Sequence, residues 1–131
     1  MFEAYYNYKS IFMQKLAKRE EQIMQVVWQL EKAFVKEIID ELPNPKPHYN
    51  TVSTIVRILE EKGFISHKSF GNTHQYFPAI SKEDYQKSAV GDVLKNYFDD
   101  SYSKMVAYFA KEEKISEDEL NEIIQMIKNK K

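Results

Sequence analysis

The chain has 131 residues, with 19 Lys and Arg against 20 Asp and Glu, so its formal net charge is −1. This length corresponds to about one domain, and a hydrophobic content of 43% is enough for a folded core. The absence of cysteine excludes disulfides and thiolate chemistry, and three glycines are too few for a glycine-rich phosphate loop.

Residues 1–13 are rich in aromatic side chains but lack the basic start, continuous apolar stretch and cleavage site of a secretory signal. We therefore expect a cytoplasmic protein. Met13 comes directly before the first strong helical pattern. Residues 1–13 are interpreted as an N-terminal extension. Either the native start is Met13 and the residues before it are added, or the segment forms an aromatic arm that packs on the fold.

Apolar residues at helical spacing predict three helices in the first half of the chain. The predicted helices span Leu16–Glu31, Phe34–Leu42 and Asn50–Lys62. Three prolines between residues 43 and 47 separate the second helix from the third, because proline cannot continue a helix. Gly63 is the expected stop of the third helix.

The next segment changes to a β pattern. Phe64–Ser69 and Thr73–Phe77 predict two short strands around a tight turn that contains Gly71, and Pro78 ends the second strand. The order helix, helix, break, helix, hairpin is that of a winged helix, a helix-turn-helix variant with a two-stranded wing. We predict a mainly α fold with a winged-helix DNA-binding domain over residues 14–80.

Residues 81–131 predict three more helices, over Lys82–Phe98, from Ser101 through Phe109, and over Glu117–Lys128. A single apolar stripe on the last helix favours a helical dimerisation region over a second independent core. The candidate dimer residues are Val106, Phe109, Leu120, Ile123, Ile124 and Ile127. Three tyrosines line either this dimer seam or a ligand cavity, namely Tyr97, Tyr102 and Tyr108.

Charge is distributed unevenly along the chain. There is no acid between Leu42 and Leu59, and none from Lys62 to Lys82. Residues 81–131, in contrast, contain 9 Lys against 11 Asp and Glu. A positive helix and hairpin on a protein with an acidic remainder is typical of phosphate contact through one face.

The third helix and the hairpin supply the candidates for DNA contact. Outside its apolar stripe, the helix carries short polar side chains and one arginine, which suit base edges and phosphates. The alternative is a solvated helix face, although such faces usually carry more Glu and Lys. The predicted DNA-binding residues are Lys46, Asn50, Thr51, Ser53, Thr54, Arg57, Lys68, Asn72 and His74.

Metal binding and catalysis have weaker support. His48, His67 and His74 could hold a metal, but histidines in a wing region are more often surface or phosphate-facing residues. The acids between residues 112 and 119 fit the start of a helix, where the dipole favours negative charge. The sequence offers no nucleophile–base pair for a small hydrolase. We therefore expect neither a cofactor nor an enzyme.

The segment Tyr49–Lys68, YNTVSTIVRILEEKGFISHK, resembles the recognition helix and wing of the penicillinase-repressor family of the BlaI, MecI and CopY type. The Thr51-Val52 start, the Leu59–Gly63 helix end and the Tyr76–Pro78 wing end carry the resemblance, which extends from Leu16 to about Lys128. It implies a homodimer that represses genes from a palindromic operator, often built on TACA/TGTA halves. The lack of cysteine excludes the copper-sensing branch.

The chain departs from this family at Ile58, where the family usually has Arg, so the contacts of that arginine are not carried over to the adjacent Arg57. The resemblance also implies that a membrane sensor with a metalloprotease domain triggers cleavage in the C-terminal part. The matching stretch is Ala107–Lys111, with the cut between Tyr108 and Phe109, where Tyr108 replaces the usual Asn. The alternative function is a winged helix for protein–protein assembly without DNA affinity.

Overall fold

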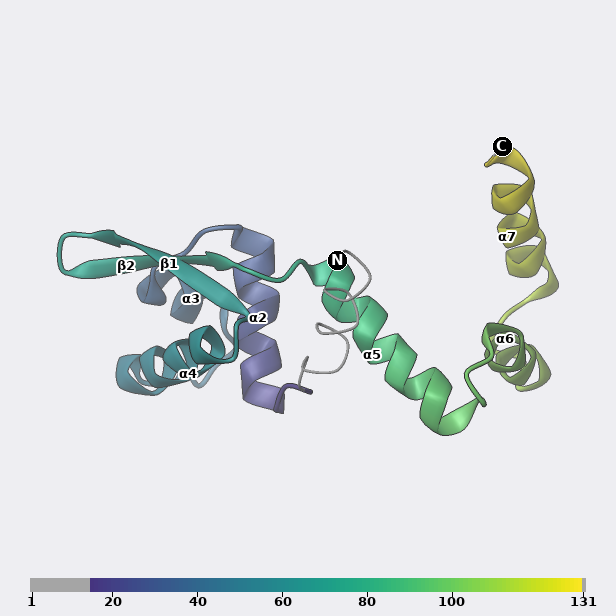
Figure 1. Cartoon of the computed structure of the whole chain (residues 1–131), viewed down its shortest axis with the longest axis horizontal. Coiled ribbons are helices and arrows are strands. Elements are labelled where there is room, and N and C mark those ends of the chain that lie inside the picture. The colour runs from purple at the N-terminus through teal and green to yellow at the C-terminus, as the bar shows by residue number, and fades with distance from the viewer. Residues whose placement is uncertain (1–14, 131) are drawn as a thin grey trace, which may run out of the picture. The chain divides into compact units, whose positions relative to one another are not determined.

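The computed structural model of the chain describes residues 15–130, so the extension predicted over residues 1–13 lies outside the described residues. The described chain forms two compact units, the N-terminal unit up to Ser88 and the C-terminal unit from Ala89 onward (Figure 1). None of the helices between residues 15 and 130 combines the length and the hydropathy needed to span a membrane.

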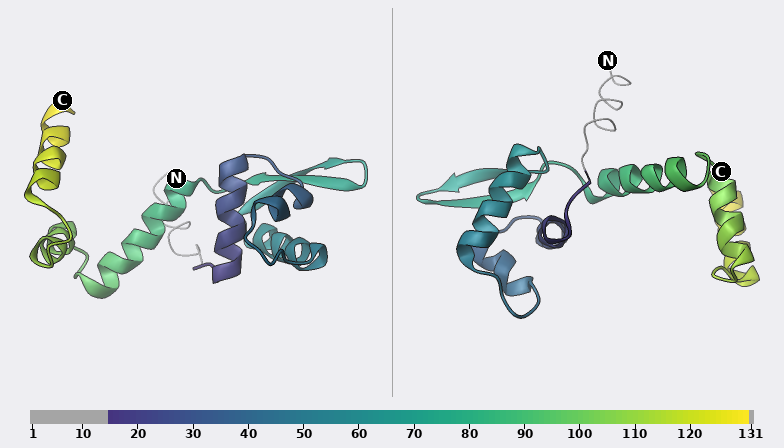
Figure 2. Two further views of the ribbon diagram at one scale, coloured as in Figure 1. Left: turned by 180° about the vertical axis from the view of Figure 1, so that it is seen from behind. Right: turned by 90° about the horizontal axis from the view of Figure 1, so that it is seen from below.

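The N-terminal unit contains three helices followed by a two-stranded antiparallel hairpin. The helices are α2 (Lys18–Leu30), α3 (Val35–Glu41) and α4 (Tyr49–Glu61), and the strands are β1 (Ile65–Phe70) and β2 (Thr73–Pro78). α4 and the hairpin lie on the same side of α2 (Figures 1 and 2). The order of elements is the predicted one, so the winged-helix fold is confirmed.

The core of this unit is built from the predicted apolar stripes of the three helices and from the entry to β1. Its fully or almost fully buried side chains include Ile23, Val27, Ile38, Val52, Val56, Leu59, Phe64 and Ile65. Burial of a side chain of this size stabilises the fold by about 1.5–3 kcal/mol. Because α4 packs on both α2 and α3 through this stripe, its opposite face is left for solvent.

Two glycines set the limits of the recognition helix and the wing. Gly63 has φ +86° at the end of α4, where its N–H donates to Glu60 O at 3.0 Å. Gly71 has φ +60° in the two-residue turn between β1 and β2. Both angles lie in the left-handed region that favours glycine, which explains why the chain stops its helix and reverses its strand at these positions.

The hairpin is anchored at its base. Its register pairs Ile65 with Pro78 and Phe70 with Thr73. On the other side of β2, the Ala33 N–H donates to Tyr76 O at 2.9 Å and the Tyr76 N–H donates to Ala33 O at 2.8 Å. This bridge ties the wing to the segment between α2 and α3.

The first turns of α5 (Lys82–Tyr97) belong to the N-terminal unit. The ring of Tyr85 packs against Trp28 at 5.5 Å and against Phe64 at 5.8 Å between centroids. The Trp28 indole N–H donates to Ile80 O at 2.9 Å and fixes the chain just before α5. The division between the two units therefore falls inside α5 and not at residue 80, where the winged-helix domain is predicted to end.

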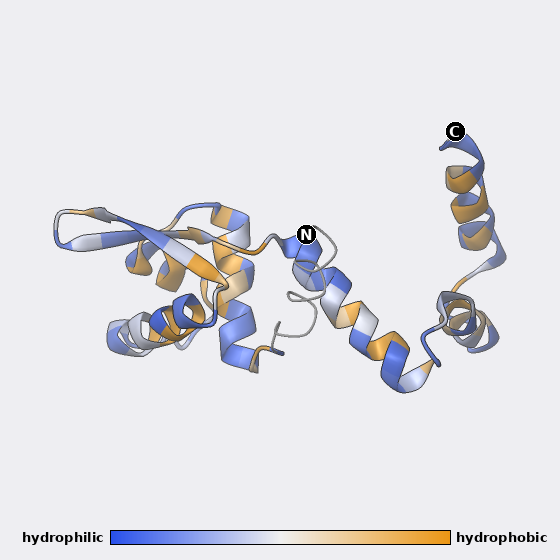
Figure 3. Cartoon of the chain, in the orientation of Figure 1, coloured by the Kyte–Doolittle hydropathy of each residue, from blue (hydrophilic) through white to orange (hydrophobic). Residues whose placement is uncertain are grey.

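The C-terminal unit contains the rest of α5 together with α6 (Tyr102–Lys111) and α7 (Glu117–Asn129). Ser116 and Glu119 form a capping box at the start of α7: the Glu119 N–H donates to Ser116 Oγ at 3.1 Å, and the Ser116 N–H donates to Glu119 Oε1 at 2.9 Å. Hydrophobic residues recur along α7 (Figure 3).

Glu20 links the start of α2 to the end of α4. Its carboxylate accepts the Ala17 N–H at 2.8 Å and the Lys62 ammonium at 2.8 Å. Burial raises the pKa of Glu20, but the two hydrogen bonds and the charge of Lys62 together lower it more, so the pKa lies below its ordinary value. The ion pair therefore stabilises the contact between the two helices when Glu20 is ionised.

We expect Glu20→Gln to lower the free energy of unfolding by about 1 kcal/mol at pH 7. Because the folded pKa is below the unfolded one, this stabilisation is complete above the ordinary value of 4.5 and is lost as the pH falls through the lowered value. Urea unfolding at pH 7 and at about pH 3 should show a smaller cost at the lower pH. An equal cost at both pH values would show that the charge of Glu20 does not stabilise the fold.

Candidate DNA-binding surface

The outer face of α4 carries most of the helix residues predicted to contact DNA. Asn50, Thr51, Thr54 and Arg57 are exposed, and Ser53 is half-buried. Asn50, Thr54 and Arg57 follow one another at positions i, i+4 and i+7, so they form one row along the helix. A single face of α4 therefore presents an amide, hydroxyls and a guanidinium to solvent.

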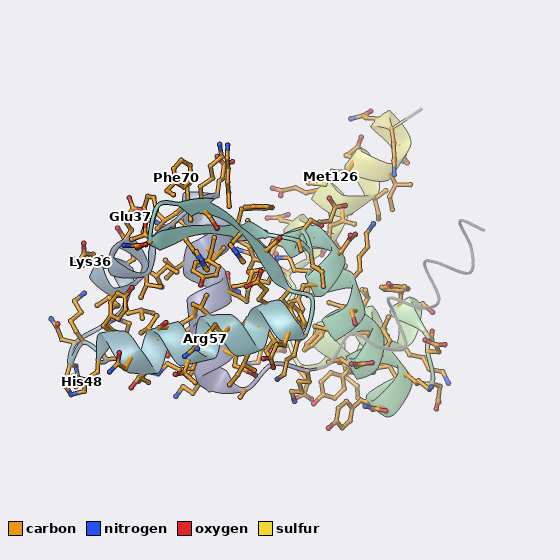
Figure 4. All side chains as sticks on the ribbon, turned by 60° about the vertical axis from the view of Figure 1, so that its left-hand side comes forward. Lys36, Glu37, His48, Arg57, Phe70 and Met126 are labelled. Atoms are coloured by element: carbon orange, nitrogen blue, oxygen red, sulfur yellow. The ribbon has the colours of Figure 1, made fainter. Side chains whose placement is uncertain are left out.

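The N-terminal end of this helix is electrostatically suited to an anion. The first turn of α4 contains no acid, so nothing there offsets the positive end of the helix dipole. His48 lies at this end of the helix, and Arg57 lies further along on its outer side (Figure 4). Within residues 15–130, the Arg57 guanidinium makes no hydrogen bond or ion pair, so its donors are available to a ligand.

A cleft of about 710 Å³ runs between α4, the start of α3 and the hairpin. The lining contains mostly hydrogen-bond donors and aromatic rings: Phe34, Val35, Lys36, Glu37, Tyr49, Ser53, Arg57, Asn72, Thr73, His74 and Tyr76. The one acid of this lining, Glu37, accepts the Phe34 N–H at 2.8 Å and so caps α3. Figure 4 shows Lys36 and Glu37 on α3, with Arg57 on α4. The cleft brings Ser53, Arg57, Asn72 and His74 together.

The lining also contains residues outside the predicted DNA-binding set. Tyr49 is 49% exposed in the first turn of α4, and its spacing of four residues from Ser53 and eight from Arg57 could have placed it on the same side of the helix. Burial raises the pKa of the Tyr76 hydroxyl, Glu60 and Tyr49 raise it further, and Arg57 lowers it. The pKa of Tyr76 therefore lies above its ordinary value.

The wing places its three candidates differently. Asn72 lies in the turn and His74 lines the cleft. Lys68 pairs with Gln75 and so lies on the opposite face of the hairpin from His74, because side chains alternate along a strand. Its ammonium lies 5.5 Å from the centroid of the Phe70 ring. The alternation of side chains along a strand could by itself have predicted that Lys68 and His74 lie on opposite faces of the hairpin.

Lys46, which is also predicted to contact DNA, has a structural role. Its ammonium donates to Asp40 O at 2.8 Å and to Leu42 O at 2.5 Å. Both carbonyls lie at the end of α3, where helix carbonyls lack intrahelical partners. Lys46 therefore caps this helix before the chain enters the proline-rich segment.

The C-terminal unit presents the candidate dimer surface. Val106, Phe109, Ile123, Ile124 and Ile127 are exposed, with Ile127 at 65%, and Leu120 is half-buried. Six further hydrophobic side chains of this unit are exposed, namely Val90, Val93, Tyr97, Tyr102, Tyr108 and Met126. Figure 4 shows Met126 on α7. Such a concentration of exposed apolar side chains is typical of an interface.

Among the described residues, no group of three or more His, Cys, Asp or Glu side chains is arranged to hold a metal ion. The described residues thus form a winged helix, a polar recognition face that includes Arg57, and a donor-lined cleft beside it. Together they define a DNA-binding protein of the winged-helix class.

Comparison with known proteins identifies the family. A family model described as Penicillinase repressor matches residues 16–129. The chain belongs to the penicillinase repressor family, whose members are transcriptional repressors and not enzymes. The match confirms the resemblance carried by the recognition helix and the wing.

Individual relatives match along most of their length. The methicillin resistance regulatory protein MecI of Staphylococcus aureus strain N315 is 25% identical over 117 residues, which cover 88% of this chain and 95% of MecI. The penicillinase repressor of Bacillus licheniformis is 26% identical over 122 residues, which cover 89% of this chain and 92% of that protein. The solved DNA-binding domain of the repressor BlaI is 28% identical, with a TM-score of 0.48, over 54% of this chain and 88% of that chain.

Proposed function

We propose that this chain is a sequence-specific transcriptional repressor that binds a palindromic DNA operator as a homodimer in the cytoplasm. The observation that carries the proposal is the row Asn50, Thr54 and Arg57 on the outer face of α4 beside a donor-lined cleft. Short polar side chains allow the helix to approach base edges in the major groove closely. Arg57 and the residues of the cleft are suited to the sugar–phosphate backbone.

The proposed homodimer forms through the exposed apolar residues of α6 and α7. Leu120, Ile123, Ile124 and Ile127 recur at helical spacing, and the interior of the C-terminal unit does not cover the last three. A second copy of the chain would remove this stripe from water. It would also supply the second recognition helix that a palindromic operator requires.

We also propose that proteolysis releases the repressor, with a membrane sensor-protease as the source of the signal. The peptide bond between Tyr108 and Phe109 lies inside α6, and both side chains are exposed. A cut at this bond would separate α7 from the N-terminal unit. The DNA-binding surface would then lose most of the proposed dimer residues.

The proposed function is tested by titrating the intact chain and its Arg57→Ala variant with duplex DNA at several salt concentrations. We expect the affinity of the intact chain to fall steeply with salt, because phosphate contact releases counterions. Arg57→Ala should cost about 1–3 kcal/mol of binding. If Arg57 contacts a base, the variant should also lose sequence preference at one operator position. If Arg57 contacts a phosphate, the variant should bind all sequences more weakly to the same degree.

Arg19→Ala is the matched control, because Arg19 is the other arginine of the chain and is exposed on α2. Its substitution removes the same charge away from the proposed surface. Equal losses in the two variants would remove Arg57 from the site. Failure of the intact chain to bind duplex DNA would favour the alternative, a winged helix that assembles with another protein.

A further inference from the structure

A hydrogen bond joins the recognition helix to the wing halfway along β1. Glu60 Oε2 of α4 lies 2.6 Å from His67 Nδ1. An ionised carboxylate only accepts, so the His67 Nδ1–H donates to it. Each side chain is 30% exposed. Because the contact is partly buried, water screens it less than it would screen a fully exposed pair.

The oriented ring of His67 in turn supports His74. The two imidazoles stack with 4.0 Å between centroids and 6° between planes, and both lie near the Tyr76 ring, at 5.8 Å and 6.1 Å. His67, His74 and Tyr76 share one face of the hairpin, since His67 pairs with Tyr76 and His74 is two residues away on the same strand. His74 is exposed and lines the cleft beside Arg57.

Other contacts also hold the wing against the helices. The Ala33–Tyr76 bridge fixes the base of β2. The Phe34 and Phe70 rings meet edge to face at 5.9 Å near the turn. Glu60 is the polar group of α4 that reaches this face of the hairpin through a hydrogen bond. His74 is therefore in contact with the rings of His67 and Tyr76, and His67 is in turn hydrogen-bonded to Glu60.

We propose that Glu60 and His67 are positioning residues that hold His74 over the cleft, where it contacts the DNA backbone. The inference rests on the proposed function and deepens it, because it gives a role to an acid that lies beside the proposed DNA-binding surface. By simple charge repulsion Glu60 would weaken DNA binding. As a positioning residue it strengthens binding through His74.

The test is a double-mutant cycle on the affinity of the full chain for duplex DNA that carries an operator selected from random sequences. We expect His74→Ala to weaken binding about fivefold per subunit in the wild-type chain, the size of one hydrogen bond. In a Glu60→Ala or His67→Phe background, His74→Ala should have less than about a twofold further effect. His67→Phe keeps an aromatic ring beside His74 and removes the donor to Glu60.

Glu61→Ala is the matched control. Glu61 is the next residue of α4, is exposed, and has no hydrogen bond or ion pair within the described part of the chain. Its substitution removes the same charge but keeps the contact to the wing. In this background His74→Ala should retain its full fivefold effect. Circular dichroism and thermal unfolding establish that each variant is folded.

A second measurement is the distance between two spin labels. Because the chain has no native cysteine, labels attach only to the cysteines introduced by Asn72→Cys and Thr54→Cys. The distance distribution between the wing and α4 should broaden in Glu60→Ala and stay narrow in Glu61→Ala. Additive DNA effects of Glu60→Ala and His74→Ala, or an unchanged distance distribution, would overturn the positioning role. These results would leave the proposed function intact, whereas failure of the wild-type chain to select any operator would contradict the function itself.

Discussion

A chain that ends at Tyr108 should be a folded monomer whose affinity for the full operator is lower by a factor on the order of 10²–10⁴. The truncation removes Phe109 and all of α7, and with them five of the six proposed dimer residues. In a dimer, the second recognition helix is tethered beside its half-site once the first has bound. A monomer loses this effective concentration but keeps the contacts of one half-site.

Analytical ultracentrifugation and DNA titration measure the two parts of this expectation. Ile124→Asp in the full chain is a second variant, because it places a charge in the proposed interface without removing any residue. Glu122→Asp, on the same helix, keeps its charge and serves as the control. A truncated chain that stays dimeric and binds the operator with full affinity would show that the dimer region and the release mechanism are both assigned wrongly.

Phe64→Ala should destabilise the N-terminal unit by about 3–5 kcal/mol. Phe64 is 1% exposed, and it lies where α4 ends and β1 begins. Its ring meets Tyr85 edge to face at 5.8 Å, and its carbonyl accepts the Ala79 N–H at 2.9 Å. Truncation to alanine leaves a cavity between the helices, the wing and the start of α5.

Urea unfolding of the full chain tests this loss, with Phe77→Ala as the control. Phe77 is 37% exposed on β2, so its truncation leaves no closed cavity and should cost much less. DNA binding should fall in Phe64→Ala in proportion to the unfolded fraction. A cost similar to that of Phe77→Ala would show that Phe64 does not hold the wing to the helices.

The elements of the N-terminal unit could be predicted from sequence because their signals are local. The stripe Val52, Val56 and Leu59 repeats at helical spacing, and its burial follows directly from that pattern. Gly63 and Gly71 mark the helix end and the turn because left-handed backbone angles favour glycine. The polar face of α4 is the complement of its buried stripe, so the candidate recognition residues could be predicted with it.

Contacts between distant residues were not predictable in this way. The Ala33–Tyr76 bridge joins two segments whose pairing depends on the packing of α2. Lys46 looked like a free cation beside DNA, but its hydrogen bonds to Asp40 O and Leu42 O depend on how the chain leaves α3. Likewise, the contact between Glu60 and His67 follows from the angle between α4 and the wing, which no local pattern determines.

The position of the division inside α5 also depends on contacts between distant residues. No proline interrupts the helix predicted over Lys82–Phe98, so the sequence alone offers no reason to divide it. Tyr85 packs on Trp28 and Phe64 and ties the first turns of α5 to the N-terminal unit. A continuous helix that begins in one unit and ends in the other cannot be assigned to either from its periodicity.

The most direct test of the account is to select binding sites for the intact chain from a pool of random duplex DNA. A homodimer with one recognition helix per subunit should enrich an inverted repeat whose half-sites face the same side of the duplex, about 10 base pairs or a multiple of that apart. The Tyr108-terminated chain should enrich at most a single half-site. Failure of the intact chain to enrich any sequence, or enrichment of an isolated half-site by both chains alike, would contradict a dimeric, sequence-specific repressor.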